Sequence, residues 1–333
     1  MKVFFSLTLS LVIITTILSG CTKKVETKLT KVKLNEVVRS VFYAPMYAAI
    51  NQGFFKEEGI DIDLSTGQGA DKTAQDVLSG NADIGFCGPE QTIYIYNQKR
   101  DNYPILFAQL TQTDGSFLVG RKSEKNFDWS SLKGKTIIGG RPGGVPEMAL
   151  EYVLKSKGLK NRQNINLVTN IAFTATAGAF KSGTGDYVAL FEPTASMIVK
   201  DNAGSVVASI GKSIGTLPYT CFFSTKTYLD KNKDIIEKFT RAIYKGQKWV
   251  LKNSDEVVAT SIKSFFPGTD ISILTETTKN YKEINAFSST PLIKEEDMAR
   301  LMDVIQSYRA SLIKERPAFK AIVNTEIAKK VIK

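Results

Sequence analysis

Two glutamates in this sequence stand where an α/β fold places its ligands. Glu90 follows the apolar run 82–86 through a Gly-Pro turn, and Glu192 follows the apolar run 187–191 and precedes a proline. In open α/β sheets, ligands bind beyond the carboxyl ends of the strands, where loops lead into helix N-termini. Two carboxylates that face such a cleft would prefer an amine, although a carboxylate at a helix start can also serve only to complement the helix dipole.

Five further residues occupy loops of the same kind. Tyr43 could stack on a planar ligand or belong to the core. Arg141 could clamp sulfonate, carboxylate or phosphate oxygens with two hydrogen bonds, or remain a surface charge. Gln68 and Asp114 could add directed hydrogen bonds, and Gly143 belongs to a glycine turn that opens a helix with free N–H groups. Two acids and an aromatic favour an amino-bearing heterocycle or a zwitterion over an inorganic anion.

The 333 residues include no histidine. This excludes Ser-His and Cys-His nucleophile pairs, a histidine general base and histidine-containing zinc sites. Carboxylate or lysine chemistry remains open. We therefore expect a binding protein without a metal or cofactor, and we keep an enzyme that uses Glu90 or Glu192 as an alternative.

The N-terminus has the pattern of an export signal. Lys2 precedes an apolar run, 3–18, that is short for a membrane span, and the sequence Leu-Ser-Gly-Cys ends at Cys21. This sequence resembles the bacterial lipobox, which implies cleavage of residues 1–20 and lipid attachment to the Cys21 thiol. We expect the mature chain to be extracytoplasmic and anchored by lipid to a bacterial membrane, with 21–33 as a polar tether.

Two cysteines remain in the mature body, Cys87 and Cys221. They could form a disulfide in an exported protein if their Cα atoms came within about 7 Å. Because both lie in apolar, strand-like runs, we expect buried free thiols.

The chain is basic, with a net charge of +11 and a pI near 9.3. Its lysines are scattered through amphipathic segments and do not form one basic run with interleaved aromatics, so we expect no nucleic-acid partner.

Short apolar strands alternate with amphipathic helices, which predicts an α/β fold with mostly parallel sheets covered by helices. The mature length suits two lobes. We expect lobe 1 to span 34–115 and 222–333, with a helical tail that packs back on it, and lobe 2 to span 116–221. A weak internal echo supports two similar lobes: a helix, a Gly turn, an Asp-led strand and a Pro-marked turn occur in 80–90 and again in 183–193.

Several segments carry a resemblance to one family. They are 45–60 (PMYAAINQGFFKEEGI), 78–85 (LSGNADIG), 132–135 (LKGK) and 191–193 (FEP). The chain resembles solute-binding proteins of bacterial ABC importers, in the alkanesulfonate, nitrate, taurine and thiamine-pyrimidine-precursor family. The resemblance implies a type II periplasmic-binding-protein-like fold, with two lobes joined by two crossing strands and a ligand cleft between them.

The same resemblance implies capture of a small organic solute by lobe closure and delivery to ABC permease and ATPase subunits, without a reaction. The cysteine-rich, histidine-bearing motif of the pyrimidine-synthesising eukaryotic relatives is missing, which argues against synthesis. A surface lipoprotein without a transport role stays as a further alternative.

Overall fold

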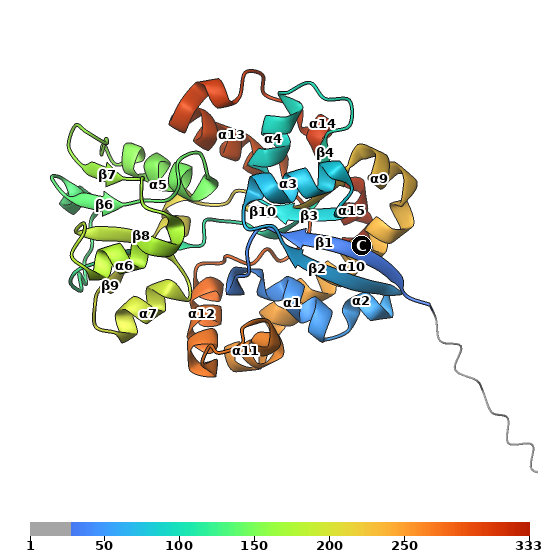
Figure 1. The fold of residues 1–333 in the computed structure, drawn as a ribbon, viewed down its shortest axis with the longest axis horizontal. Coiled ribbons are helices and arrows are strands. Elements are labelled where there is room, and N and C mark those ends of the chain that lie inside the picture. Colours follow the sequence, from blue (N-terminus) through green and yellow to red (C-terminus); the bar gives the residue numbers. More distant parts are fainter. Residues whose placement is uncertain (1–27) are drawn as a thin grey trace, which may run out of the picture.

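The computed structural model describes residues 28–333. Cys21, the predicted signal and most of the predicted tether lie outside the described residues. Figure 1 shows two lobes side by side, each built around one sheet.

Each lobe contains a five-stranded sheet. In spatial order, the first sheet is β2 (Ile60–Thr66), β1 (Thr30–Glu36), β3 (Ile84–Cys87), β10 (Thr220–Thr225) and β4 (Pro104–Thr111). The second is β7 (Asn166–Val168), β6 (Thr136–Ile138), β8 (Tyr187–Phe191), β5 (Ser116–Gly120) and β9 (Ser205–Ser209). The α/β class and the two-lobe architecture predicted from the sequence are confirmed.

The two sheets share one topology. In each, the first three strands are parallel and the fourth, β10 or β5, is antiparallel to both neighbours. That antiparallel strand is the one that has just crossed from the other lobe. β4 enters β5 through 112–115, and the return runs from β9 through α8 (Ile210–Ile214) and 215–219 into β10. The chain therefore crosses between lobes where the parallel strands end.

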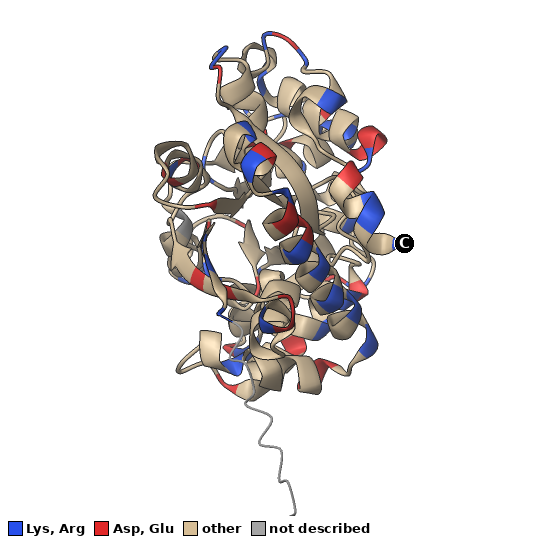
Figure 2. Cartoon of the chain, turned by 90° about the vertical axis from the view of Figure 1, so that its right-hand side faces the viewer, with Lys and Arg blue, Asp and Glu red and all other residues tan. Residues whose placement is uncertain are grey.

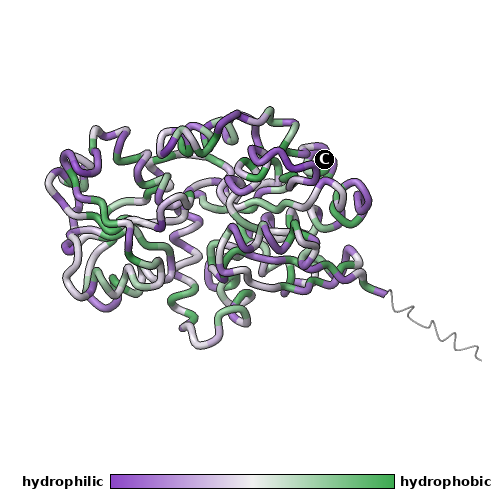
Figure 3. Tube along the Cα trace, turned by 45° about the horizontal axis from the view of Figure 1, so that its top comes forward, coloured by the Kyte–Doolittle hydropathy of each residue, from purple (hydrophilic) through white to green (hydrophobic). Residues whose placement is uncertain are grey.

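Burial differs between the two edge strands of the first sheet, β4 and β2. Every residue of β4 and β10 is buried, as expected for strands covered on both faces, and both are apolar-rich. β2 lies at an edge and alternates, with Ile60, Ile62 and Leu64 facing inward. Figure 3 shows the hydrophobic stretches inside each lobe and hydrophilic ones along the outer helices.

Helices cover the first sheet on both faces. Figure 1 places α3 (Ala70–Ser79) and α4 (Glu90–Tyr96) on one face, and α1 (Ala44–Asn51), α2 (Phe54–Glu57) and α10 (Lys233–Lys252) on the other. Gly246 allows α10 to approach α1 closely, since a Cβ there would lie 2.2 Å from the Pro45 carbonyl oxygen. The remaining helices of this lobe are α9 (Lys226–Lys231), α11 (Asp255–Ile262), α14 (Phe319–Ile322) and α15 (Glu326–Ile332).

The second sheet carries α5 (Val145–Ser156), α6 (Thr176–Lys181) and α7 (Thr194–Lys200). Two C-terminal helices bridge the lobes: α12 (Ile271–Glu283) contacts α7, and α13 (Glu295–Arg309) contacts α5. The sequence predicted that this tail packs back on lobe 1; in the structure α12 and α13 also contact helices of lobe 2. An amphipathic pattern identifies a buried helix face but does not identify the surface that covers it.

Two boundaries also differ from the prediction. The first strand begins at Thr30, not at residue 34, because Thr30 to Lys33 pair with Ile60 to Asp63 of β2. Three of these four residues are exposed threonine or lysine and only Val32 is buried, so their polarity suggested a tether. β10 begins at Thr220, so the first lobe resumes two positions before the predicted residue 222.

The internal echo corresponds to equivalent elements. α3, Gly80, β3, Pro89 and α4 follow one another in lobe 1, and α6, Gly183, β8, Pro193 and α7 do so in lobe 2. β3 and β8 hold the third place in their sheets. The two candidate glutamates therefore stand at equivalent ends of equivalent strands, one residue apart in register.

Basic and acidic residues are interspersed along the chain in both lobes, as Figure 2 shows. Across residues 28–333, we find no helix with the length and apolar character that a membrane crossing needs.

Candidate functional site

An aromatic cluster joins the two lobes where their strands end. Its centre is Phe42, in the 3-10 turn Val41–Tyr43 that follows β1. The Phe42 ring centroid lies 6.0 Å from that of Phe191, at the end of β8, 5.6 Å from Tyr219 in the return crossing, and 4.9 Å from Tyr281 of α12. The buried apolar side chains of both lobes are continuous through this cluster.

The lobes also meet beside the cluster. The Tyr94 hydroxyl of α4 lies 3.9 Å from the Met148 sulfur of α5, and Arg141 approaches Asp71 at 3.8 Å. The second contact is mostly exposed and contributes little. The structure therefore shows the lobes in contact, in a closed arrangement.

One buried carboxylate oxygen in this region, Glu90 Oε2, has no hydrogen-bond partner among the described residues. Two other buried acids are paired side chain to side chain, Asp114 with Tyr219 and Glu147 with Glu151. Buried polar atoms are nearly always paired, because an unpaired one costs about 1–3 kcal/mol. An unpaired carboxylate oxygen at the contact between two lobes is the feature expected of a site whose partner is a ligand.

Glu90 is the first residue of α4 and is only 3% exposed. Burial raises the pKa of its carboxyl to about 7. Hydrogen bonds from its own backbone and from Gln91, and the positive charge of Arg141, act in the opposite direction and lower the pKa. The influence of Arg141 shows that this guanidinium, carried by lobe 2, lies near the carboxyl, carried by lobe 1. Near neutral pH, a group with this pKa exchanges its proton when a charged ligand arrives.

Asp114 lies in the first crossing and is fully buried. Its Oδ1 accepts hydrogen bonds from the Ser116 backbone N–H, at 2.7 Å, and from the Ser116 hydroxyl. Burial raises its pKa despite these bonds and a further hydrogen bond with Tyr219. Burial also raises the pKa of Tyr219, and the Asp114 charge, the hydrogen bond with Asp114 and the charges of Tyr43 and Glu90 raise it further. Asp114, Tyr219, Tyr43 and Glu90 are thus neighbours.

Tyr43 is 5% exposed, and its ring packs edge-on against Phe86 at 4.6 Å. Burial raises its pKa, and a hydrogen bond with Thr220 of β10 opposes that shift. Tyr43 is therefore part of the core, and it also lies close enough to Glu90 for the Glu90 charge to raise its pKa. The sequence had offered a core position and a ligand-facing position as alternatives.

Glu192 has a different environment from Glu90. Its carboxylate accepts hydrogen bonds from the Ser196 N–H at 2.9 Å, the Ser196 hydroxyl at 2.8 Å and the Asn280 amide at 2.6 Å. Asn280 lies on α12, so this carboxylate ties lobe 2 to the bridging helix. Glu192 precedes its proline, whereas Glu90 follows one. The two carboxyls therefore have different surroundings although their strands are equivalent: Glu192 bonds with Ser196 and Asn280, and Glu90 with Gln91.

The other predicted residues lie nearer the surface. Gln68 is exposed, with a left-handed φ of 59° just before α3. Gly143 has a φ of 81° in the turn before α5, and its backbone bonds with Tyr308. The structure thus brings Tyr43, Glu90 and Asp114 near Tyr219, with Arg141 acting on Glu90 from the surface. Gln68 lies apart from them. Glu192 is buried at the aromatic cluster, where its N–H donates to the Tyr281 hydroxyl at 3.2 Å.

Sequence reasoning missed Glu147 and Tyr219. Glu147 lies in the first turn of α5 and is fully buried, with its Oε2 accepting from the Gly140 N–H at 2.7 Å. Burial raises its pKa to about 8. An acid flanked by the apolar face of Val145 and Met148 was the available signal; Tyr219 carried none, because an aromatic in an apolar crossing is indistinguishable from core.

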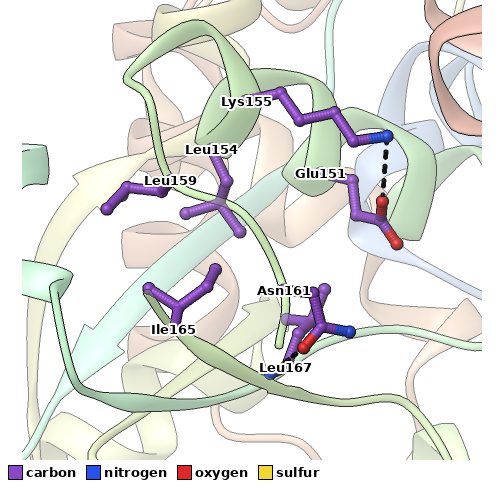
Figure 4. Close-up of a pocket in the computed structure, with 7 residues that line it drawn as sticks. All are labelled: Glu151, Leu154, Lys155, Leu159, Asn161, Ile165 and Leu167. Carbon is purple, nitrogen blue, oxygen red and sulfur yellow. Dashed lines mark hydrogen bonds and ion pairs between the residues drawn. The ribbon is translucent and has the colours of Figure 1, made fainter. Parts of the chain in front are cut away.

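Two hollows lie elsewhere in the described part of the chain. One, of about 10 Å³ between α5 and β7, is lined mainly by aliphatic side chains and is a packing gap (Figure 4). The other is a groove of about 670 Å³ along β9, lined among others by Lys200 of α7, Lys212 of α8, and Glu276 and Glu283 of α12. It is an alternative position for a small solute by size alone. No group of three or more acidic, cysteine or histidine side chains suited to a metal ion occurs within 28–333.

Substituting alanine for Gly115 is expected to hold the lobes apart. A Cβ at this crossing residue would lie 2.8 Å from the Phe42 ring and 3.0 Å from the Phe191 ring. Overpacking of this kind costs about 1–3 kcal/mol, and opening the lobes relieves it. Small-angle scattering should give a larger radius of gyration than for the unmodified protein. The double variant Gly115→Ala/Phe42→Leu, which makes room for the new methyl, should return to the compact value; an unchanged radius in Gly115→Ala would contradict the closed contact.

The fold and this contact between lobes define a class, the two-lobed periplasmic-binding-protein fold. The aliphatic sulphonate-binding protein SsuA of Escherichia coli shares it, with a TM-score of 0.72 at 13% identity over 88% of this chain and 96% of that one. A Methylobacillus flagellatus KT protein, titled "putative sulfonate ABC transporter, periplasmic sulfonate-binding protein SsuA", gives a TM-score of 0.71 at 18% identity over 92% of this chain and 94% of that one.

The chain belongs to the NMT1/THI5-like family, whose pattern matches residues 41–257. It is 46% identical to "Putative binding protein YtlA" of Bacillus subtilis (strain 168) over 94% of this chain and 93% of that protein. A more distant relative, at 24% identity over 63% of each chain, is the 4-amino-5-hydroxymethyl-2-methylpyrimidine phosphate synthase of Aspergillus parasiticus.

Proposed function

We propose that this protein is the extracytoplasmic solute-binding component of an ABC importer, anchored to the bacterial membrane by lipid on Cys21. The observation that carries the proposal is the buried Glu90 carboxyl, whose Oε2 has no partner, at the meeting of two lobes with the same topology. A solute held there would pair this oxygen, and lobe opening would admit and release it. The YtlA relative and the sulfonate-binding structures support the class.

The charges at the site favour a solute with N–H donors. A carboxylate oxygen without a partner needs a donor, which nitrate or a bare sulfonate does not have. Arg141, near Glu90, could hold an anionic group of the same molecule. The proposed solute is therefore an amino-bearing heterocycle or a zwitterion such as taurine.

The test is thermal denaturation of the purified protein with aminopyrimidines, taurine, alkanesulfonates and nitrate in turn. A solute at about 100 times its Kd stabilises by about 2.7 kcal/mol, which corresponds to a rise in Tm of about 4 °C for a chain of this size. Native mass spectrometry should show one bound molecule per chain. The proposal fails if no compound raises Tm and no small molecule copurifies.

The synthase relative motivates a second measurement. If the protein were an enzyme acting through Glu90 or Glu192, the stabilising compound would be converted on incubation. We expect the compound to be recovered unchanged.

A further inference from the structure

Cys87 and Cys221 face each other across two neighbouring strands. Cys87 ends β3, Cys221 is the second residue of β10, and the antiparallel register places them directly opposite. The next pair in that register, Phe86 and Phe222, has stacked rings with centroids 4.3 Å apart. The contact between the two phenylalanine rings agrees with this strand register. The strand pairing therefore sets the distance between the Cα atoms of Cys87 and Cys221, which the sequence could not give.

This geometry suits a disulfide. Directly opposite residues of an antiparallel pair have Cα atoms about 4.5–5.5 Å apart and side chains on the same face of the sheet. Disulfides usually join Cα atoms about 4.4–6.8 Å apart. In the structure both cysteines are free thiols, both fully buried, and the Cys87 thiol donates to the Gly88 carbonyl oxygen at 3.4 Å.

We propose that Cys87 and Cys221 are joined by a disulfide in the exported protein. This inference rests on the proposed function only for the extracytoplasmic location, where thiols are oxidised. The bond would close a loop that contains β4 and the whole second lobe, so it would link the two ends of that insertion at their base. It would also tie the strand that delivers Glu90 to the strand that follows Tyr219.

The step is an ordinary thiol–disulfide exchange with an extracytoplasmic disulfide oxidant. The thiolate of one cysteine attacks a sulfur of the oxidant and forms a mixed disulfide, and the oxidant's other sulfur leaves as a thiolate. The second cysteine then attacks the mixed disulfide and displaces the remaining oxidant sulfur. Two electrons and two protons leave the protein, and the oxidant becomes a dithiol. Because both sulfurs are inaccessible in the folded protein, the exchange occurs while the chain folds, and folding then protects the bond.

The direct test uses the full chain isolated from the cell envelope of its host, with free thiols blocked by N-ethylmaleimide during lysis. Proteolysis without reduction, followed by mass spectrometry, should give one peptide pair that joins Cys87 to Cys221. Both cysteines recovered as maleimide adducts, or either one joined to Cys21, would overturn the proposal.

Stability gives a second readout. Reduction in denaturant followed by refolding in reductant should lower the Tm of the unmodified protein by about 5 °C or more, because a closed loop of this length strongly restricts the unfolded chain. The matched variant Cys87→Ala/Cys221→Ala should show no such difference between oxidised and reduced samples. A Tm of the unmodified protein that is equally insensitive to reduction would contradict the bond.

The solute titration separates the two proposals. If free thiols are found and a solute still raises Tm, only the disulfide is wrong. If the linked peptide is found and no solute binds, the proposed function is wrong and the disulfide stands.

Discussion

Replacing Glu90 with glutamine is expected to stabilise the solute-free protein by about 3 kcal/mol at pH 8 and to weaken solute binding at least tenfold. Burial holds the pKa of this carboxyl at about 7, above the ordinary value of 4.5. The folded protein therefore binds a proton that the unfolded chain has already released, and stability falls as pH rises from about 4.5 to about 7. Each unit of difference corresponds to about 1.4 kcal/mol. Glutamine has no proton to lose, so Glu90→Gln removes this penalty.

Urea unfolding at two pH values measures the effect. The advantage of Glu90→Gln should be about 3 kcal/mol at pH 8 and shrink to about 1 kcal/mol at pH 5, where the wild-type carboxyl is protonated when folded. Glu192→Gln is the matched control. Since both of its oxygens accept hydrogen bonds, its loss should destabilise by about 1–3 kcal/mol. A loss of stability for Glu90→Gln that does not vary with pH would show that the carboxyl is ionised and structurally paired.

The binding half of this prediction locates the site. Isothermal titration of the solute that raises Tm should show the tenfold loss for Glu90→Gln and no loss for Glu276→Gln, which lies on the wall of the groove along β9. The reverse outcome would move the site from the contact between the lobes to that groove. Truncating a charged partner in a desolvated site commonly costs 2–5 kcal/mol, so a tenfold loss is a modest expectation.

The same substitution, glycine to alanine, should have opposite effects in two helices. In α10, a Cβ on Gly246 would lie 2.2 Å from the Pro45 carbonyl oxygen and 2.9 Å from the Ala49 Cβ. Alanine gains about 1 kcal/mol in helix propensity, but the helices must separate, at a cost of several kcal/mol. Gly246→Ala should therefore lose about 2–3 kcal/mol in net stability and displace α1, which directly follows Phe42 and Tyr43.

In α6, Gly178 has no atom within 4 Å of an added Cβ. Gly178→Ala should raise stability by about 0.5–1 kcal/mol, because alanine loses less backbone entropy on folding. Guanidinium denaturation of both variants checks the signs. If Gly246→Ala also stabilises, the close approach of α10 to α1 is not real.

Much of the fold was predictable because it depends on local pattern. The alternation of Ile60, Ile62 and Leu64 predicted a half-buried strand, and β2 is one. The repeated order of helix, Gly turn, strand and Pro turn identified β3 and β8 as equivalent. The prediction that residues 30–33 form a tether was wrong, because polar residues also occur in strands where one side of the sheet is exposed. The pairing with β2 that makes them a strand joins segments 30 positions apart and is not visible in the local pattern.

The candidate site was only partly predictable. Position after a strand identified Glu90, and it could not separate Glu90 from Glu192, since both follow equivalent strands. The difference arises from Asn280 of α12, which lies 88 positions from Glu192 in sequence and donates to its carboxylate. Glu147 and Tyr219 became visible only when the fold buried them among other titratable groups.

The sequence by itself determined the alternation of strands and helices, the half-buried pattern of β2, and that histidine chemistry is absent, because these properties depend on residue type and short-range periodicity. Only the tertiary structure decided which buried acids lack a partner, which helices bridge the lobes, and that Cys87 lies opposite Cys221. Those outcomes depend on pairing between segments far apart in the chain, and burial changes the free energy of a carboxyl or a thiol only after that pairing has removed it from water.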